Sequence, residues 1–261
     1  MQVEKFNEFK IEKVVVSKIE TIISIFLKII LLGIGVAGVV LSFPYLFEEG
    51  IKYFLEFVEF RLMLIATLVI FIELIFDIIY LITDKYYKNK YLSTIKLALM
   101  VALIINFFQY AILMAPFVEV SVWFERIDTL FLAIVAPIIL VTDYILSDYS
   151  YQSKRYYAYF ALIPGTISMG LNFILTSGFN LFGDQVFINS IYDYNKNGWF
   201  TFDLSLSNAK EGVYGIGVGY LIIFGAILAI LLALLLLFIK NKRQISKYNL
   251  QLEKNLYHQD L

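Results

Sequence analysis

Cysteine is absent from the sequence and histidine occurs once, at His258. The lack of cysteine excludes a disulfide, an iron–sulfur cluster, a thiolate zinc site and a cysteine nucleophile. His258 follows the last apolar segment, so an imidazole metal cluster and a histidine base at membrane depth are excluded as well. A P-loop motif is also missing. The sequence therefore predicts no cofactor.

Charge is scarce in this chain. Charged residues make up 16% and hydrophobic residues 60% of the 261 positions, against roughly 25% and 45–50% in soluble domains. The formal net charge is -1 and no basic face with interleaved aromatics stands out, so nucleic acid is not an expected partner. Apolar stretches recur along the whole chain, which predicts a single domain embedded in the lipid bilayer.

Six segments have the roughly 20 apolar residues that a membrane helix requires. In hydrocarbon the backbone must satisfy its own hydrogen bonds, and the short alternating strands of a closed barrel are not seen, so the prediction is all-α with six transmembrane helices. The first segment is longer than a signal-peptide core and has no A-x-A cleavage site, which predicts an uncleaved helix. The segments are Thr21–Phe43, Leu62–Ile82, Leu92–Val118, Thr129–Ser147, Tyr156–Phe179 and Gly215–Ile239.

Lysine and arginine collect on one side of the predicted bundle. That side, which includes both tails, carries 14 of them and the other side carries five. Cytoplasmic flanks hold the excess of basic residues, so the prediction is N-in and C-in. The single domain 1–261 then consists of a cytoplasmic segment 1–20, a bundle 21–239 with an extracytoplasmic loop 180–214, and a basic cytoplasmic tail 240–261. The tail reads either as a solvated flank or as an interfacial helix.

Five ionisable residues lie inside the predicted helices. Such groups cost a few kcal/mol each at membrane depth and are functional candidates by default. Glu73 and Asp77 share one helix face, and two carboxylates so close resist being ionised together. One interpretation is a structural ion network that pairs Asp77 and Asp143 with Lys28 and Lys96 near the cytoplasmic boundary. The alternative is a proton or ion path, with Glu73 nearer the midplane.

Uncharged polar residues form stripes on two further segments. Asn106 and Gln109 share a face of the third, and Ser168 and Asn172 share a face of the fifth. These stripes either line a midplane cavity together with Glu73 or act as adhesive between helices. Pro137 and Pro164 fall inside the fourth and fifth segments, where they are expected to kink or loosen the backbone.

The outer loop contains the pattern D-x-N-x-N-G, formed by Asp193, Asn195, Asn197 and Gly198. Alternating oxygens of this kind begin a calcium loop. The bidentate carboxylate expected at position twelve is missing, and Asp203 stands one place early. The alternatives are a calcium site and an aromatic-anchored Asn-Gly turn.

The fourth segment, FLAIVAPIILVTDYIL, carries Pro137, Asp143 and Tyr144, and the later stretch YDYNKNGWFTFDL is rich in tyrosine and phenylalanine and carries Phe202 and Asp203 near its end. Both resemble bacterial relatives of the androgen-induced-gene-like family of six-helix membrane proteins. The resemblance implies a bacterial plasma-membrane location and a lipid or amphiphilic ligand. Eukaryotic members hydrolyse fatty acid esters of hydroxy fatty acids with an intramembrane threonine and histidine.

The residues that perform this hydrolysis are not matched here. The expected histidine is replaced at Ala133 and its neighbours, and the threonine motif is not recognisable in FRLMLIATLVIF. Thr67 is the nearest candidate nucleophile, but it lies off the Glu73/Asp77 face and has no activating partner by helical spacing. Three hypotheses follow: a lipid-ester hydrolase, a small transporter or substrate-binding membrane subunit, and a structural or assembly factor.

Overall fold

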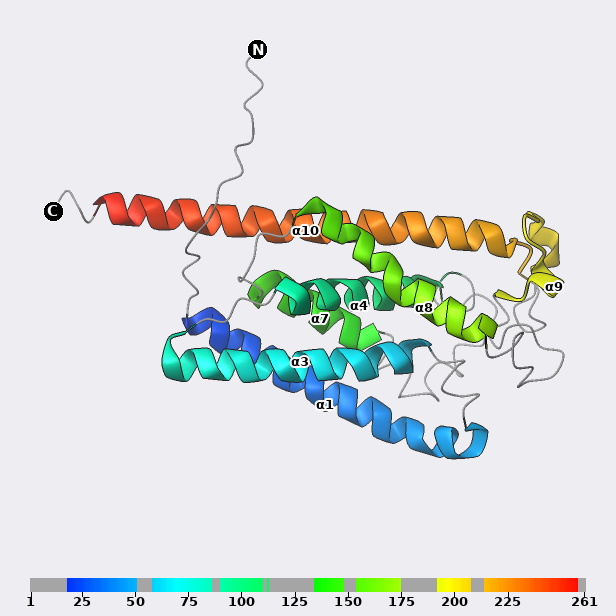
Figure 1. Cartoon of the computed structure of the whole chain (residues 1–261), viewed down its shortest axis with the longest axis horizontal. Helices are drawn as coiled ribbons and strands as arrows, with labels where there is room; N and C mark the ends of the chain where they lie inside the picture. The colour runs from blue at the N-terminus through cyan, green and yellow to red at the C-terminus, as the bar shows by residue number, and fades with distance from the viewer. Residues whose placement is uncertain are drawn as a thin grey trace, which may run out of the picture.

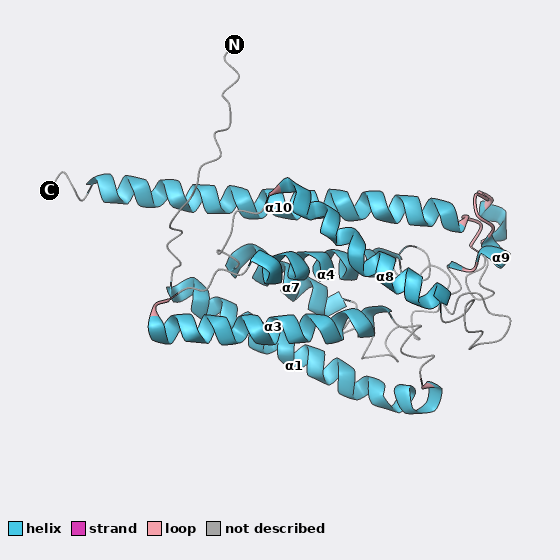
Figure 2. Cartoon of the chain, in the orientation of Figure 1, coloured by secondary structure: helices cyan, strands magenta, loops and turns pink. Residues whose placement is uncertain are grey.

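The computed structural model describes most of the bundle and its outer cap, and the elements in it are helical (Figures 1 and 2). Within this part of the chain no strand is formed, and a single isolated bridge joins Phe202 to Ile216. The all-α prediction is confirmed for these residues. The described residues are 18–50, 58–85, 90–109, 112, 134–147, 154–174, 192–207 and 214–257.

Nine helical elements are assigned in the described ranges. Four of them are long and apolar enough to cross a membrane, over Lys18–Pro44, Phe60–Thr83, Tyr91–Gln109 and Val218–Lys247. The chain thus has apolar helices of the length and composition expected of an α-helical membrane protein. The elements are α1 (Lys18–Glu49), α3 (Val58–Thr83), α4 (Lys90–Gln109), α7 (Ala136–Ser147), η4 (Arg155–Ala161), α8 (Leu162–Phe173), α9 (Tyr194–Asn197), η7 (Leu204–Leu206) and α10 (Val218–Tyr257).

The fifth predicted segment is not one continuous α-helix, and of the fourth only residues 134–147 are described. α7 has 12 residues, about 18 Å of helix, and the expected start at Thr129 lies outside the described residues. The fifth segment is divided into the 3-10 helix η4 and the α-helix α8. Pro164 is the third residue of α8 and has no N–H for the carbonyl one turn earlier, which favours the tighter winding before it. Pro137 instead stands at the start of α7, directly after a π-helical turn.

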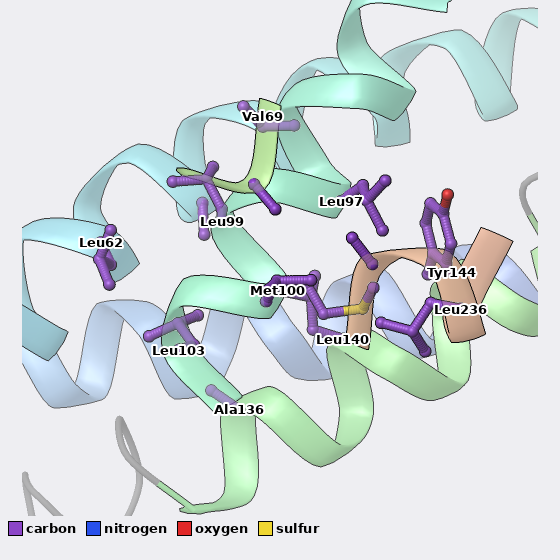
Figure 3. Packing of buried hydrophobic residues seen from close by; sticks show 14 of the residues in the cluster. Leu62, Val69, Leu97, Leu99, Met100, Leu103, Ala136, Leu140, Tyr144 and Leu236 are labelled. Carbon is purple, nitrogen blue, oxygen red and sulfur yellow. The ribbon is translucent and has the colours of Figure 1, made fainter. Parts of the chain in front are cut away.

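α4 is the central helix of the bundle. It contacts α3, α7, η4, α8 and α10, so most of the apolar residues in its middle turns are buried. Leu97, Met100 and Leu103 are at most 1% exposed and pack among Leu140 of α7 and Leu236 of α10 (Figure 3). The apolar side chains on the outward faces of α1, α3 and α10 are exposed instead. A surface of this kind is suited to hydrocarbon rather than water.

α10 continues well past the expected end of the last span at Ile239. It runs for 40 residues to Tyr257, about 60 Å, and its C-terminal end extends beyond the other helices (Figure 1). Lys240 and Gln244 are buried; Lys240 donates to Ser93, and Arg243 donates to the Ile145 carbonyl. The expectation of a solvated flank is therefore wrong for this first part of the tail. Its basic residues recur at spacings of three and four and attach α10 to α4 and α7.

The N-terminal end of α10 is held by the loop that precedes it. The Asp203 amide donates to the Gly215 carbonyl at 2.7 Å, and the Gly217 amide donates to the Thr201 carbonyl at 2.7 Å. Gly215 has a φ of 71°, and a Cβ there would lie 2.0 Å from the Asp203 carbonyl oxygen. Only glycine fits both the backbone angle and this close approach.

Candidate functional site

Four helices form a closed ring around a buried set of polar side chains. α1 contacts α3 and α7, and α4 contacts the same two helices. α1 and α3 each supply two side chains spaced four residues apart, which project from one face; α4 and α7 supply one each. We call these six residues the ion network: Ser24, Lys28, Glu73, Asp77, Lys96 and Asp143.

Each ammonium group of the ion network contacts more than one carboxylate. Lys28 Nζ lies 2.6 Å from Asp77 Oδ2 and 3.7 Å from Asp143 Oδ2. Lys96 Nζ lies 2.5 Å from Asp143 Oδ2 and 2.6 Å from Glu73 Oε2. Asp77 and Asp143 are thus paired with Lys28 and Lys96, as in the ion-network interpretation. Glu73, for which the alternative was a place at a midplane cavity, belongs to the same cluster.

The ion network is buried among the helices. The exposed side-chain fractions are 0% for Asp143, 2% for Lys96 and 4% for Lys28. Single charges at such positions cost several kcal/mol of desolvation, which only close opposite charges and hydrogen bonds offset. The four helices therefore depend on one another, because each supplies a charge that another neutralises.

Ser24 is a member that sequence reasoning missed. Its Oγ accepts a hydrogen bond from Lys28 Nζ at 2.6 Å and lies 2.8 Å from Asp77 Oδ2 and 3.2 Å from Asp143 Oδ1. The available signal was its position four residues before Lys28, on the same helix face. Serine is common as helix adhesive in lipid, so the signal was weak.

A second feature is an apolar groove of about 410 Å³ between α3, α4 and the η4–α8 segment, which we call the lateral groove. Its volume falls in the range of small-molecule sites, roughly 300–1,000 Å³. The walls are almost entirely aliphatic and aromatic. The lining residues are Arg61, Leu62, Leu64, Ile65, Thr94, Ile95, Ala98, Leu99, Phe160, Ile163, Pro164, Ile167, Ser168 and Leu171.

Arg61 is the charged residue among those that line the lateral groove. Its Nη2 donates to Ser168 Oγ at 2.5 Å, and the residue is 7% exposed. The predicted second span begins at Leu62, so Arg61 was expected just outside it. In the structure it belongs to the first turns of α3, where its stem packs with the helix. In the sequence Arg61 directly precedes an apolar run, and this adjacency was the signal that could have identified it as part of the helix.

On the other side of α8 lies a cavity of about 150 Å³ between α4, α8 and α10. Most of its lining residues are aliphatic, but Asn106, Gln109 and Ser168 line it together with Tyr192, which lies just before α9, and we call it the polar cavity for these groups. Gln109 Nε2 donates to the Tyr192 hydroxyl at 2.7 Å. Burial raises the pKa of this hydroxyl, and the hydrogen bond from Gln109 opposes that shift in part.

Of the two alternatives for the polar stripes, the midplane cavity is realised in part. Asn106, Gln109 and Ser168 meet at one cavity. Glu73 is not among the described residues that line it, because Glu73 faces the opposite side of α4, in the ion network. The Asn172 side chain lies outside the described part of the structure. Tyr192 joins the cavity from a distant loop, which helical spacing could not indicate.

The candidate nucleophile Thr67 packs at the contact between α1 and α3. Its Oγ1 donates to the Met63 carbonyl at 2.7 Å, the usual bond of a threonine to its own helix. A Cβ built on Gly35 would lie 2.4 Å from this Oγ1, so the two helices approach closely here. Because this hydroxyl donates its proton to a backbone carbonyl, it is not positioned for a neighbouring base to remove that proton and activate the oxygen as a nucleophile.

The oxygens of the calcium candidate are used locally. Asp193 accepts from the amides of Asn195 and Lys196 and so caps α9, while Asn197 Oδ1 accepts from the Tyr214 amide at 2.9 Å. Asp203 accepts from the amide and hydroxyl of Ser205, which lowers the pKa of its carboxyl. Across the described ranges, no set of three acidic, histidine or cysteine side chains is placed to hold a metal ion.

The alternative of an aromatic-anchored turn describes this loop better. The rings of Tyr194 and Trp199 stack with centroids 5.2 Å apart. Between them Gly198 has a φ of 67°, a left-handed angle typical of an Asn-Gly turn.

The family prediction remains to be tested by other means, because comparisons with protein-family models, curated proteins and solved structures give no match. The structure identifies the chain at the level of its architecture, an all-α protein with several membrane-length apolar helices.

Proposed function

We propose that this chain is a six-span protein of the bacterial plasma membrane, with both tails in the cytoplasm, that binds a lipid-like amphiphile without hydrolysing it. The spans would be α1, α3, α4, the segment ending in α7, the η4–α8 segment and α10. An even number of spans agrees with the excess of basic residues next to both tails. Fusion of a reporter active only in the cytoplasm to each end tests the topology, and inactivity of either fusion would contradict it.

The observation that carries the function is the lateral groove. It offers about 410 Å³ of apolar space with Arg61 among its lining residues. Apolar walls suit an acyl chain, and a buried guanidinium suits an anionic head because it presents several donors in a fixed plane. The environment of Thr67 gives no support to hydrolysis, which leaves binding as the function that the groove favours.

Titration of the protein in nanodiscs of zwitterionic lipid with a fluorescent long-chain fatty acid tests this function. Saturable binding beyond the partition into empty discs is expected. Ile167→Trp, which places an aromatic side chain in the groove, is expected to weaken binding about tenfold or more, a loss of at least ~1.4 kcal/mol. Ile138→Trp is the matched control, since Ile138 on α7 is similarly exposed, at 63% against 56%, and does not line the groove.

Two outcomes of that titration would overturn the proposal. One is binding that never exceeds the partition into empty discs. The other is equal binding by the Ile167→Trp and Ile138→Trp variants. Recovery of an esterified probe after incubation, with no free fatty acid released, is the further result that separates binding from hydrolysis.

A proton-coupled transporter is the second candidate, and Ser24 is the observation that favours it. Its hydroxyl has one proton, yet its Oγ faces carboxylate oxygens of both Asp77 and Asp143. If one carboxyl carries a proton, that carboxyl donates to Oγ while the serine donates to the other, and every contact is satisfied. Groups that hold and release a proton between helices are the core of proton relays in membrane transporters.

Infrared spectroscopy of the protein at neutral pH tests this second candidate. A carbonyl band of a protonated carboxylic acid is expected in the natural sequence and is expected to be lost in Asp143→Asn. Glu48→Gln, on an exposed position of α1, is the control and should leave the band unchanged. Absence of the band from the natural sequence would contradict a protonated carboxyl in the ion network.

A further inference from the structure

The lateral groove and the polar cavity adjoin one another. Leu62, Pro164 and Ser168 line both spaces, so the two spaces share a border formed by α3 and α8. The groove is almost entirely apolar, whereas the cavity adds amide and hydroxyl groups to a largely aliphatic lining. A ligand with two chemically different ends could therefore occupy both at once, provided that its middle lies at the shared wall.

Arg61 and Ser168 stand at this junction. Arg61 lines the groove, Ser168 lines both spaces, and the guanidinium donates to the serine hydroxyl. Arginine binds phosphate oxygens through parallel N–H groups, and such charge-assisted bonds are stronger than those between neutral groups. The middle of the ligand that this junction favours is thus an anionic phosphodiester.

The polar cavity selects against a charged head. None of its described lining residues is acidic or basic. Asn106, Gln109 and Tyr192 offer uncharged donors and acceptors, and burial raises the pKa of the Tyr192 hydroxyl further above neutral pH. An ammonium or carboxylate buried there would lack a partner of opposite charge, whereas hydroxyl groups would find partners.

We propose that the site takes an anionic phospholipid with an uncharged, hydroxylated head group. One acyl chain occupies the lateral groove, the phosphodiester lies at Arg61 and Ser168, and the head enters the polar cavity. The order of the three environments along the protein is the order of the three groups along such a lipid. This inference rests on the proposed function, since it requires that the groove holds an acyl chain.

Gly225 provides a way to test the head-group part separately. It lies on α10 in the cavity wall, and a Cβ built there would meet only Gln109 Nε2, at 3.9 Å. A larger side chain at this position extends into the cavity and leaves the groove unchanged. Gly170 of α8 is the matched control, because it lines neither space and a Cβ there meets nothing within 4 Å.

The experiment is competition of three lipids against the fluorescent fatty acid in nanodiscs, at fixed salt. Phosphatidylglycerol has the uncharged hydroxylated head, phosphatidic acid has no head beyond the phosphate, and phosphatidylethanolamine has an ammonium head. Phosphatidylglycerol is expected to compete best. Gly225→Leu is expected to lower the apparent affinity for phosphatidylglycerol about tenfold and to leave phosphatidic acid unchanged, while Gly170→Leu alters neither.

Arg61→Gln is expected to weaken the binding of both anionic lipids about tenfold or more, since it removes the guanidinium charge that would bind the phosphate of either lipid. Equal competition by phosphatidylglycerol and phosphatidic acid, with no effect of Gly225→Leu, would overturn the head-group inference while the groove proposal stands. No saturable binding of the fatty acid at all would overturn both. Thermal unfolding of each variant, compared with the natural sequence, shows whether a lost affinity reflects the site or the fold.

Discussion

Replacement of Lys96 by methionine tests the ion network most directly. Methionine keeps most of the volume of the lysine stem and removes the ammonium group. Lys96 Nζ contacts Asp143 and Glu73 at 2.5 and 2.6 Å, and the three side chains are at most 14% exposed. Loss of one partner from a buried ion pair costs about 3–5 kcal/mol, because it leaves charge behind without compensation. We expect a loss of unfolding free energy in that range.

The second arm of the test adds Asp143→Asn to Lys96→Met. This change removes one of the carboxylates that the lysine compensated, and Lys28 still lies 3.9 Å from Glu73. The double variant is therefore expected to recover about 2 kcal/mol relative to Lys96→Met alone, a coupling within the usual range for contacting residues. Steric-trap unfolding in bicelles measures both free energies.

Lys18→Met is the matched control for these variants. Lys18 pairs with Asp84 at 2.8 Å, but both side chains are more than 60% exposed, so solvent screens the pair. No measurable change is expected. A cost below about 1 kcal/mol for Lys96→Met, together with additive effects in the double variant, would show that the network does not hold the four helices together.

Three further predictions follow from close contacts. Gly35→Ala should cost about 1–3 kcal/mol of unfolding free energy because its methyl group would overlap Thr67 Oγ1. The control Gly33→Ala, with open space around it, should be neutral or slightly stabilising. Equal losses of unfolding free energy in the two variants would contradict the close packing of α1 and α3. Thr67→Ala should leave the hydrolysis of a panel of long-chain esters at the level of empty nanodiscs, as in the natural sequence; ester cleavage abolished by this change would establish a threonine hydrolase. Ser205 lowers the pKa of the Asp203 carboxyl in the folded state, so this carboxyl should add stability that is present above its unfolded pKa and is lost as pH falls through the folded pKa. Ser205→Ala should reduce this loss of stability at acid pH, measured by unfolding as a function of pH. An unchanged pH profile in the variant would contradict the prediction.

The elements that the sequence predicted well are those set by composition. Runs of about 20 apolar residues have one stable form in hydrocarbon, so α1, α3, α4 and α10 follow from hydropathy alone. Helical spacing also indicates which charges share a face, as for Glu73 and Asp77. The elements predicted less well are those that depend on neighbours. The buried start of the C-terminal tail arises from contacts with α4 and α7 that hydropathy does not measure.

Arg61 and Ser24 show why the candidate sites could not be derived in full. An arginine beside an apolar run is equally compatible with a loop flank and with a helix, and its burial depends on what α8 places against it. The role of Ser24, one helical turn before Lys28, depends on two carboxylates that come from other helices. Neither partner is close in sequence, so no local pattern contains the information.

By itself the sequence determined that the surface of the helices suits hydrocarbon, that the secondary structure is helical, and which charged residues lie within the apolar segments. These properties are sums over local residues, which composition and periodicity report directly. The tertiary structure alone decided which charges meet, how the polar stripes divide between the ion network and the polar cavity, and where the lateral groove opens. Those features depend on the relative placement of helices that are distant in sequence, and small differences in packing, such as the approach of α1 and α3 at Gly35, set that placement.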